Sequence, residues 1–214
     1  MGFKTELETF RATLPPELTL GSAASGAQPG SAGVRTLFLN NWYFHILILI
    51  FRPFVVFHAQ WQRYHRLSVS THPERIPASR RQLPPWILSA CAICVDAARE
   101  LLLSLVAIIE TNELVRRLGY TCFYVECGAF LLIFNMLRDP HGEGSEDARV
   151  LAKAIEAMEK MLDTRPRNIS LFAIKRMLAL VQGAELGDGE TPEIVDTPGN
   201  TVGSLVFVVL GGRC

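Results

Sequence analysis

Between Ile87 and Ile108, apolar residues recur at alternating spacings of four and three. The positions are Ile87, Cys91, Cys94, Ala98, Leu101, Leu105 and Ile108. This spacing keeps the side chains on one side of an α-helix, so it predicts a helix with a continuous buried seam. Pro85 is suited to the first turn of that helix, and Asn112 to its exit or to a restart. Because such a seam must be covered by other helices, the pattern favours an all-α bundle.

Two further segments are apolar on nearly every side. Leu37–Phe51 is typical of a central helix surrounded by others, and we expect Pro53 to kink or interrupt it near Phe51 before the chain continues helically to about Leu67. Tyr120–Leu137 predicts a second such helix, which ends before Asp139-Pro140 because the residue before proline leaves helical geometry.

The last two predicted helices are amphipathic. Ser145 is suited to cap the first, with Glu146 and Asp147 in its first turn, and Glu156 and Lys160 form an exposed pair four residues apart. Its apolar face consists of Leu151, Ala154, Ile155, Met158, Met161 and Leu162. After a break around Arg165-Pro166, the second helix carries Leu171, Ile174, Met177, Leu178 and Val181, and Gly183 is a natural stop.

These segments divide the chain into four parts. Residues 1–20 hold a short N-terminal helix, Thr5–Leu14, which Pro15-Pro16 ends, and residues 21–36 are rich in glycine, serine and alanine and predict a flexible loop. Residues 37–183 form the helical domain, within which Ser68–Pro85 predicts a long surface connection. Residues 184–214 form an irregular tail, because Gly183–Asn200 carries five acidic residues and no basic one.

The charge and cysteine content narrow the class of protein. The 214 residues include 21 Lys or Arg and 21 Asp or Glu, so the chain lacks the positive field that drives DNA binding. Five cysteines, an odd number, and no secretion signal at Met1 indicate a reducing, intracellular location.

Membrane insertion is the alternative that the apolar segments raise. Trp42–Phe57 has 16 residues with Arg52 and Pro53 among them, whereas a spanning helix needs about 20 apolar residues. Tyr120–Leu137 has a similar length and contains Glu126. We therefore expect both to be buried helices of a soluble bundle with no membrane partner, and a membrane-associated helical protein is the second hypothesis.

Few residues are arranged for chemistry. Cys91 and Cys94 form a CxxC pair, but a zinc site needs four ligands and the other candidates, Cys122 and Cys127, lie in a predicted apolar helix. We interpret Cys91 and Cys94 as small hydrophobic residues on the seam, with a metal or redox protein as the third hypothesis. The histidines form no HExxH motif, and neither a P-loop nor a GxSxG elbow is present. The sequence therefore predicts no enzyme, catalytic residue, metal ligand or cofactor.

Four polar residues interrupt the apolar segments: His45, Arg52, Glu126 and Asn135. Buried charges need partners, so we expect Arg52 or Glu126 to form an ion pair or to line a small cavity. Structural contacts in the core are the favoured interpretation, and a ligand-sensing pocket is the alternative.

The order of the local patterns resembles a known family. The patterns are ELETFRATLPPEL (Glu6–Leu18), ILIFRPF within Trp42–Phe54, CVDAARELL from Cys94, YTCFYVECGAFLLIFNML (Tyr120–Leu137) and RPRN in the closing pair of helices. Over roughly residues 3–182 they resemble the middle homology region, or fungal-specific transcription factor domain, of fungal binuclear zinc-cluster transcription factors. The family's six-cysteine zinc cluster is absent from this sequence.

The resemblance implies an all-α regulatory domain that acts in the nucleus on RNA polymerase II transcription. It implies protein partners, namely a DNA-binding module or the transcription machinery, with DNA contacted only indirectly, and it leaves a homodimer and a small-molecule effector open. No zinc ligand or DNA contact carries over to a residue of this chain, so no cofactor is expected. A truncated product of a longer gene is one hypothesis for the missing cluster.

Overall fold

The computed structural model describes residues 2–14, 31–71, 83–138 and 144–183, and all regular secondary structure in these ranges is helical. The prediction of an all-α fold is therefore confirmed. The helices are α1 (Gly2–Thr13), α3 (Ser31–Thr71), α4 (Pro85–Thr111), α5 (Glu113–Arg116), α6 (Thr121–Arg138), α7 (Gly144–Glu159) and α8 (Arg165–Val181). The tail after Gly183, most of the predicted loop 21–36 and most of the Ser68–Pro85 connection lie outside the described residues.

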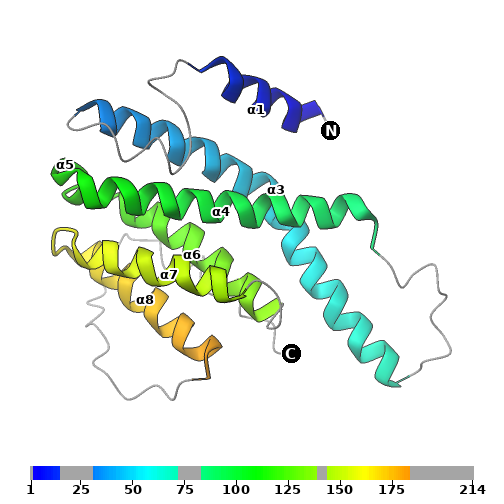
Figure 1. The fold of residues 1–214 in the computed structure, drawn as a ribbon. Coiled ribbons are helices and arrows are strands. Elements are labelled where there is room, and N and C mark those ends of the chain that lie inside the picture. The colour runs from blue at the N-terminus through cyan, green and yellow to red at the C-terminus, as the bar shows by residue number, and fades with distance from the viewer. Residues whose placement is uncertain (1, 15–30, 72–82, 139–143, 184–214) are drawn as a thin grey trace, which may run out of the picture.

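Helix α4 is the central element, and it packs against α3, α6 and α7 (Figure 1). All seven residues of the predicted seam are buried, so that prediction is confirmed. Pro85 opens α4 as expected. Asn112 ends it and caps α5, because its side-chain oxygen accepts from the backbone N–H groups of Leu114 and Val115.

Helix α3 differs from the prediction at both ends. It begins at Ser31 rather than near Leu37, because Thr36 and Leu37 are already buried and their packing outweighs the poor helix propensity of the preceding glycine and serine. It runs through Pro53 without interruption to Thr71. Figure 1 shows α3 changing direction part-way along, as expected for a helix that contains an internal proline.

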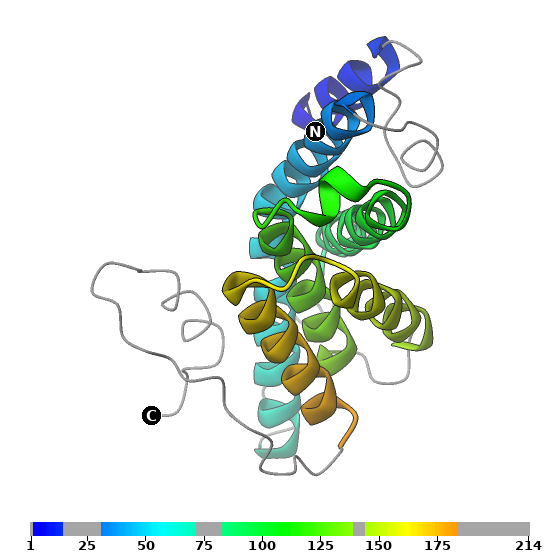
Figure 2. The same ribbon diagram turned by 90° about the vertical axis from the view of Figure 1, so that its left-hand side faces the viewer.

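Helices α6 and α7 pack on α4, α8 packs on α6 and α7, and α6 also contacts α3 (Figures 1 and 2). Gly128 allows α6 to approach α4 closely, because a Cβ there would lie 3.0 Å from the Leu102 Cγ atom. Helix α1 lies beside the N-terminal part of α3 in both views, with Arg11 near the Tyr43 hydroxyl.

Three details of α7 and the residues that follow it correct the sequence predictions. Leu162, expected on the buried face, lies beyond the end of α7 and is exposed. Lys160 contacts Glu110 of α4 at 3.1 Å, which makes a cross-helix pair instead of the expected pair with Glu156. Ser145 lies inside the first turn of α7, which begins at Gly144. The stop at Gly183 is confirmed, since α8 ends at Val181 and Gly183 has a φ of 69°.

Candidate functional site: the exposed face of α3 and a buried polar network

One side of α3 presents large apolar side chains to solvent. Phe38, Trp42, Leu49, Phe57 and Tyr64 are 42%, 61%, 52%, 46% and 72% exposed. Their spacings of four, seven, eight and seven residues place them along one side of the helix. With the exposed residues Arg35, Arg52 and Arg63 they form what we call the α3 face. An apolar surface of this extent on a helix is typical of an interaction site.

The α3 face carries charge of one sign. Between Ser31 and Thr71 there are four arginines, three histidines and no aspartate or glutamate. Arg52, expected to be buried with a partner or beside a cavity, is instead exposed, because its position on the helix turns away from α4. Within the described ranges, no hydrogen bond or ion pair joins Arg35, Arg52 or Arg63 to another residue. Their guanidinium groups are available to an anionic partner.

Aromatic contacts join the α3 face to the start of α6. Phe38 stacks on Tyr120 at a centroid distance of 5.0 Å, and the His45 ring lies 5.4 Å from Phe123 and 5.5 Å from Tyr124. Phe123 is itself 49% exposed, so the apolar surface continues from α3 onto α6. Burial, followed by the nearby Arg52 charge, lowers the pKa of His45 below its usual 6.5.

Buried polar atoms without partners lie on the same two helices. Both amide atoms of Asn41, the Nδ1 atom of His45 and the Oγ1 atom of Thr121 have no hydrogen-bond partner among the described protein atoms. Asn41 and Thr121 are fully buried. An unpaired buried polar group costs roughly 1–3 kcal/mol. Water or a small polar molecule that paired with these atoms would remove this cost.

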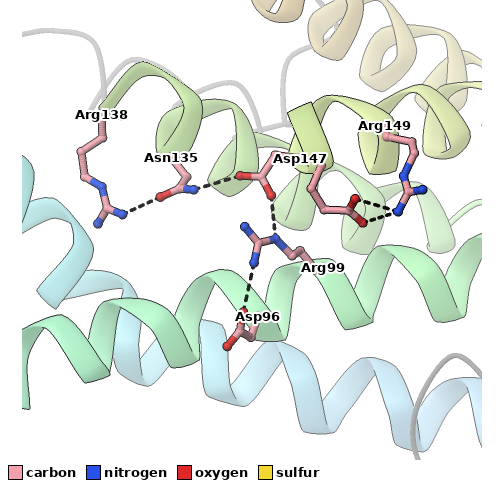
Figure 3. A network of polar contacts seen from close by, with 7 residues as sticks. Asp96, Arg99, Asn135, Arg138, Asp147 and Arg149 are labelled. Carbon is pink, nitrogen blue, oxygen red and sulfur yellow. Dashed lines mark hydrogen bonds and ion pairs between the residues drawn. The ribbon is translucent and has the colours of Figure 1, made fainter. Parts of the chain in front are cut away.

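A buried polar network connects α4, α6 and α7 (Figure 3). Its centre is Asp147 of α7, whose side chain is 0% exposed. One carboxylate oxygen of Asp147 accepts from Arg99 Nε of α4 at 2.6 Å, and the other accepts from Asn135 Nδ2 of α6 at 2.9 Å. Arg99 also contacts Asp96 at 3.2 Å. Because both oxygens of Asp147 have donors, its charge is compensated inside the bundle.

Arg138 extends the network from α6 to α3. Its Nη2 atom donates to Asn135 Oδ1 at 2.7 Å, and its Nη1 atom lies 3.2 Å from His58 Nδ1. Burial, followed by the Arg138 charge, lowers the pKa of His58. The neutral imidazole is therefore the form that suits this contact, with Nδ1 as acceptor. The chain of contacts from His58 to Arg99 joins four helices, α3, α6, α7 and α4.

The sequence located some of these polar residues and missed others. Asn135 is buried with structural contacts, as expected, and Glu126 is half-buried and accepts from Ser170 Oγ of α8 at 2.9 Å. No sequence pattern points to Arg99 or Arg138, and Asp147 has only the pattern of an acidic residue in a first helical turn. The Arg99–Asp147 pair spans 48 positions, so no local spacing could have indicated it.

The four cysteines that the structure describes are buried or half-buried, and their thiols are not activated. Burial raises the pKa of Cys94 to about 12 and that of Cys127 to about 11, and it also raises the pKa values of Cys91 and Cys122. The Cys94 thiol donates to the Ile48 carbonyl across a sulfur–oxygen distance of 3.7 Å. Metal binding and redox chemistry both need the thiolate, which burial disfavours. Within the described ranges, no group of three or more His, Cys, Asp or Glu side chains could hold a metal ion.

Two helices are long and apolar enough to cross a membrane, judged by length and composition. They are α3 over Val34–His65 and α6 over Thr121–Arg138. Half of the most apolar window of α6 (50%) is buried inside the bundle, against a third (33%) for α3. A buried core helix has the same composition, so α6 is explained by packing, whereas the exposure of α3 needs another explanation.

Comparisons of the chain with protein-family models, with curated proteins and with solved structures found no match. The family resemblance of the local patterns therefore stays a prediction.

Proposed function

We propose that this chain is a non-catalytic helical regulatory module that acts by packing against another protein. The observation that carries the proposal is the α3 face, on which exposed aromatic and apolar side chains alternate with arginines. Aromatic residues and arginine are enriched in protein interfaces and dominate their binding energy. The resemblance to the regulatory region of fungal zinc-cluster transcription factors supports a nuclear role in RNA polymerase II transcription, with DNA contacted through a partner.

The polar network offers a route from the α3 face to the rest of the module. His58 of α3 contacts Arg138, which leads through Asn135 to Asp147 and so to α7 and α4. A partner that binds one placement of helix α3 more tightly than another increases the population of that placement. It also increases the population of the network contacts that go with it. A small polar effector that pairs with the unpaired amide of Asn41 would bias the same equilibrium.

A transcription reporter tests the proposal. The full chain is fused to an unrelated DNA-binding domain in fungal cells, and we expect the fusion to change reporter output at least several-fold. Trp42→Ser with Leu49→Ser removes apolar contacts from the α3 face and should abolish the change. Leu162→Ser with Leu180→Ser is the matched control, because those residues are also exposed, at 55% and 60%, on other parts of the bundle.

The expression level of each fusion is measured in parallel, so that lost output is not mistaken for lost protein. A fusion that leaves the reporter unchanged contradicts the regulatory role. So does a purified chain that binds DNA sequence-selectively at nanomolar concentration and physiological salt, because it would then act on DNA directly.

Membrane association is the second candidate function, and the length and exposure of α3 favour it. Cell fractionation distinguishes membrane association from packing against another protein. Release of the chain from membranes by salt or carbonate, without detergent, rules out spanning helices. Extraction only by detergent would support the membrane alternative.

A further inference from the structure

We infer that the partner of the α3 face is an acidic amphipathic helix of another protein. The inference rests on the proposed function and names the class of partner. Its basis is the arrangement of charge and apolar groups along α3. From Phe38 to Tyr64 the face has a contour length of about 39 Å at 1.5 Å per residue, which matches a partner helix of about seven turns.

The α3 face has a helix-pairing spacing. Phe38, Trp42, His45, Leu49, Arg52 and Val56 follow one another at intervals of four and three. That is the spacing by which one helix packs along another. In such a row polar residues set the register and the choice of partner. His45 is half-buried against rings of α6, so Arg52 is the exposed polar residue of the row, with Leu49 one turn before it and Val56 one turn after it.

The arginines specify the charge of the partner. Arg52 and Arg63 are eleven residues apart, or about 16 Å, and both are exposed. A bound helix would remove part of their hydration, so each guanidinium needs an anionic acceptor in the complex. Glutamate or aspartate side chains three turns apart on the partner meet this requirement, and the planar guanidinium accommodates a carboxylate by two parallel hydrogen bonds.

A second copy of this chain fits the α3 face poorly. Two α3 helices packed together would bring arginine rows into one interface, and α3 has no carboxylate with which to neutralise them. Like charges opposed across an interface cost free energy and select against that pairing.

An anionic lipid surface also fits less well than a helix. In a helix that lies in a membrane interface, the cations sit on the polar side and the apolar side faces the acyl chains. Arg52 stands within the apolar row itself, between Leu49 and Val56.

The experiment uses the full chain and two designed helical peptides labelled with fluorescein. Both peptides carry leucines at spacings of three and four over seven turns. One has glutamates flanking the leucines, and the other has lysines at the same positions. Fluorescence anisotropy at 0.15 M salt should show at least tenfold tighter binding of the glutamate peptide.

Charge reversal on α3 tests whether Arg52 and Arg63, rather than the net charge of the protein, attract the glutamate peptide. Arg52→Glu with Arg63→Glu should lower the affinity for the glutamate peptide at least tenfold and raise the affinity for the lysine peptide. Lys153→Glu with Arg176→Glu makes the same change in net charge at exposed positions on α7 and α8, and it should leave both affinities within twofold. Circular dichroism and thermal melting of each variant show whether it is folded.

Three outcomes overturn the inference. Equal affinity for both peptides, or equal effects of the two charge-reversal pairs, removes the role of Arg52 and Arg63. Sedimentation with phosphatidylserine vesicles without binding of the glutamate peptide assigns the face to lipid. A dimer that Trp42→Ser with Leu49→Ser dissociates assigns it to a second copy. If the reporter still depends on Trp42 and Leu49 while peptide binding fails, only the acidic partner is wrong; if the reporter fails as well, the regulatory role is also wrong.

Discussion

Helices α4 and α3 are both long and apolar, yet they occupy different environments. Helix α4 is covered by α3, α6 and α7, and its off-seam polar residues include both signs of charge. Helix α3 packs mainly against α4, leaves large aromatic side chains exposed, and carries cations without anions. Apolar length therefore does not by itself decide burial. Oppositely charged residues accompany the helix that is buried, and charge of one sign accompanies the helix that is exposed.

The largest loss of stability should follow removal of the buried Asp147 carboxylate, which contacts Arg99 of α4. Asp147→Ala removes the buried carboxylate that accepts from Arg99 and Asn135, and we expect it to lower the free energy of unfolding by about 3–5 kcal/mol. Asp96→Ala is the control, because Asp96 contacts the same Arg99 but its side chain is 66% exposed. We expect the control to stay within about 0.5 kcal/mol in urea unfolding. Equal losses would mean that Arg99 is hydrated in solution.

The same substitution on the two helices tests the comparison directly. Leu105→Ala on α4 should cost about 2–5 kcal/mol, because Leu105 is 1% exposed and the change leaves a cavity. Leu49→Ala on α3 should cost less than about 0.5 kcal/mol, because the side chain is half exposed. Urea unfolding of the two variants gives the difference. A cost at Leu49 as large as that at Leu105 would show that the α3 face is already covered in the free protein.

The helical elements could be predicted from the sequence because each depends on the periodicity of neighbouring residues. The seam of α4, the proline that opens it and the stop at Gly183 are properties of neighbouring residues, and the structure confirms them. The start of α3 at Ser31 was missed, because it depends on burial of Thr36 and Leu37 against the rest of the bundle. Local propensity and tertiary packing disagree at that point, and packing decides.

The candidate site was less accessible from sequence. Arg52 lies in a long apolar segment, and composition alone could not show that the segment turns its arginine and aromatic residues outward. Asp147 has the ordinary signature of a residue in a first helical turn, and only the approach of α4 and α6 makes it the centre of a network. Residues that act across helices have no fixed spacing in the sequence, so both sites required the three-dimensional arrangement.

Replacing the two cysteines on α4 should lower the free energy of unfolding by a smaller amount, and it also tests for bound metal. Cys91→Ala with Cys94→Ala removes two buried sulfur atoms from the seam, and we expect a loss of about 1 kcal/mol for each in urea unfolding. Metal analysis of the purified protein should show the same content before and after the substitutions. Stoichiometric metal that disappears with the thiols would instead support the metal or redox hypothesis.

The smallest effect should be a pH dependence that arises on α3. The pKa values of His45 and His58 are lowered in the folded protein, so acidification below the unfolded value of 6.5 adds protons to the unfolded chain first. The free energy of unfolding should therefore be greatest above about pH 7 and should fall as the pH approaches 5.5. The pKa values of Glu146 and Glu159 are lowered from 4.5, so these two groups titrate below that window.

His58→Gln separates the α3 contribution from the rest. The glutamine side chain keeps an oxygen that can accept from Arg138 but has no proton to gain, so the variant should lose less stability between pH 7 and pH 5.5 than the original chain does. Thermal melting at matched ionic strength over this range measures the difference. An unchanged pH profile would mean that the pKa of His58 is not lowered in solution, and so that His58 is neither buried nor beside Arg138. Helix α3 would then lack the contact with Arg138 of α6. The proposed route from the α3 face to Asp147 would be broken at its first step.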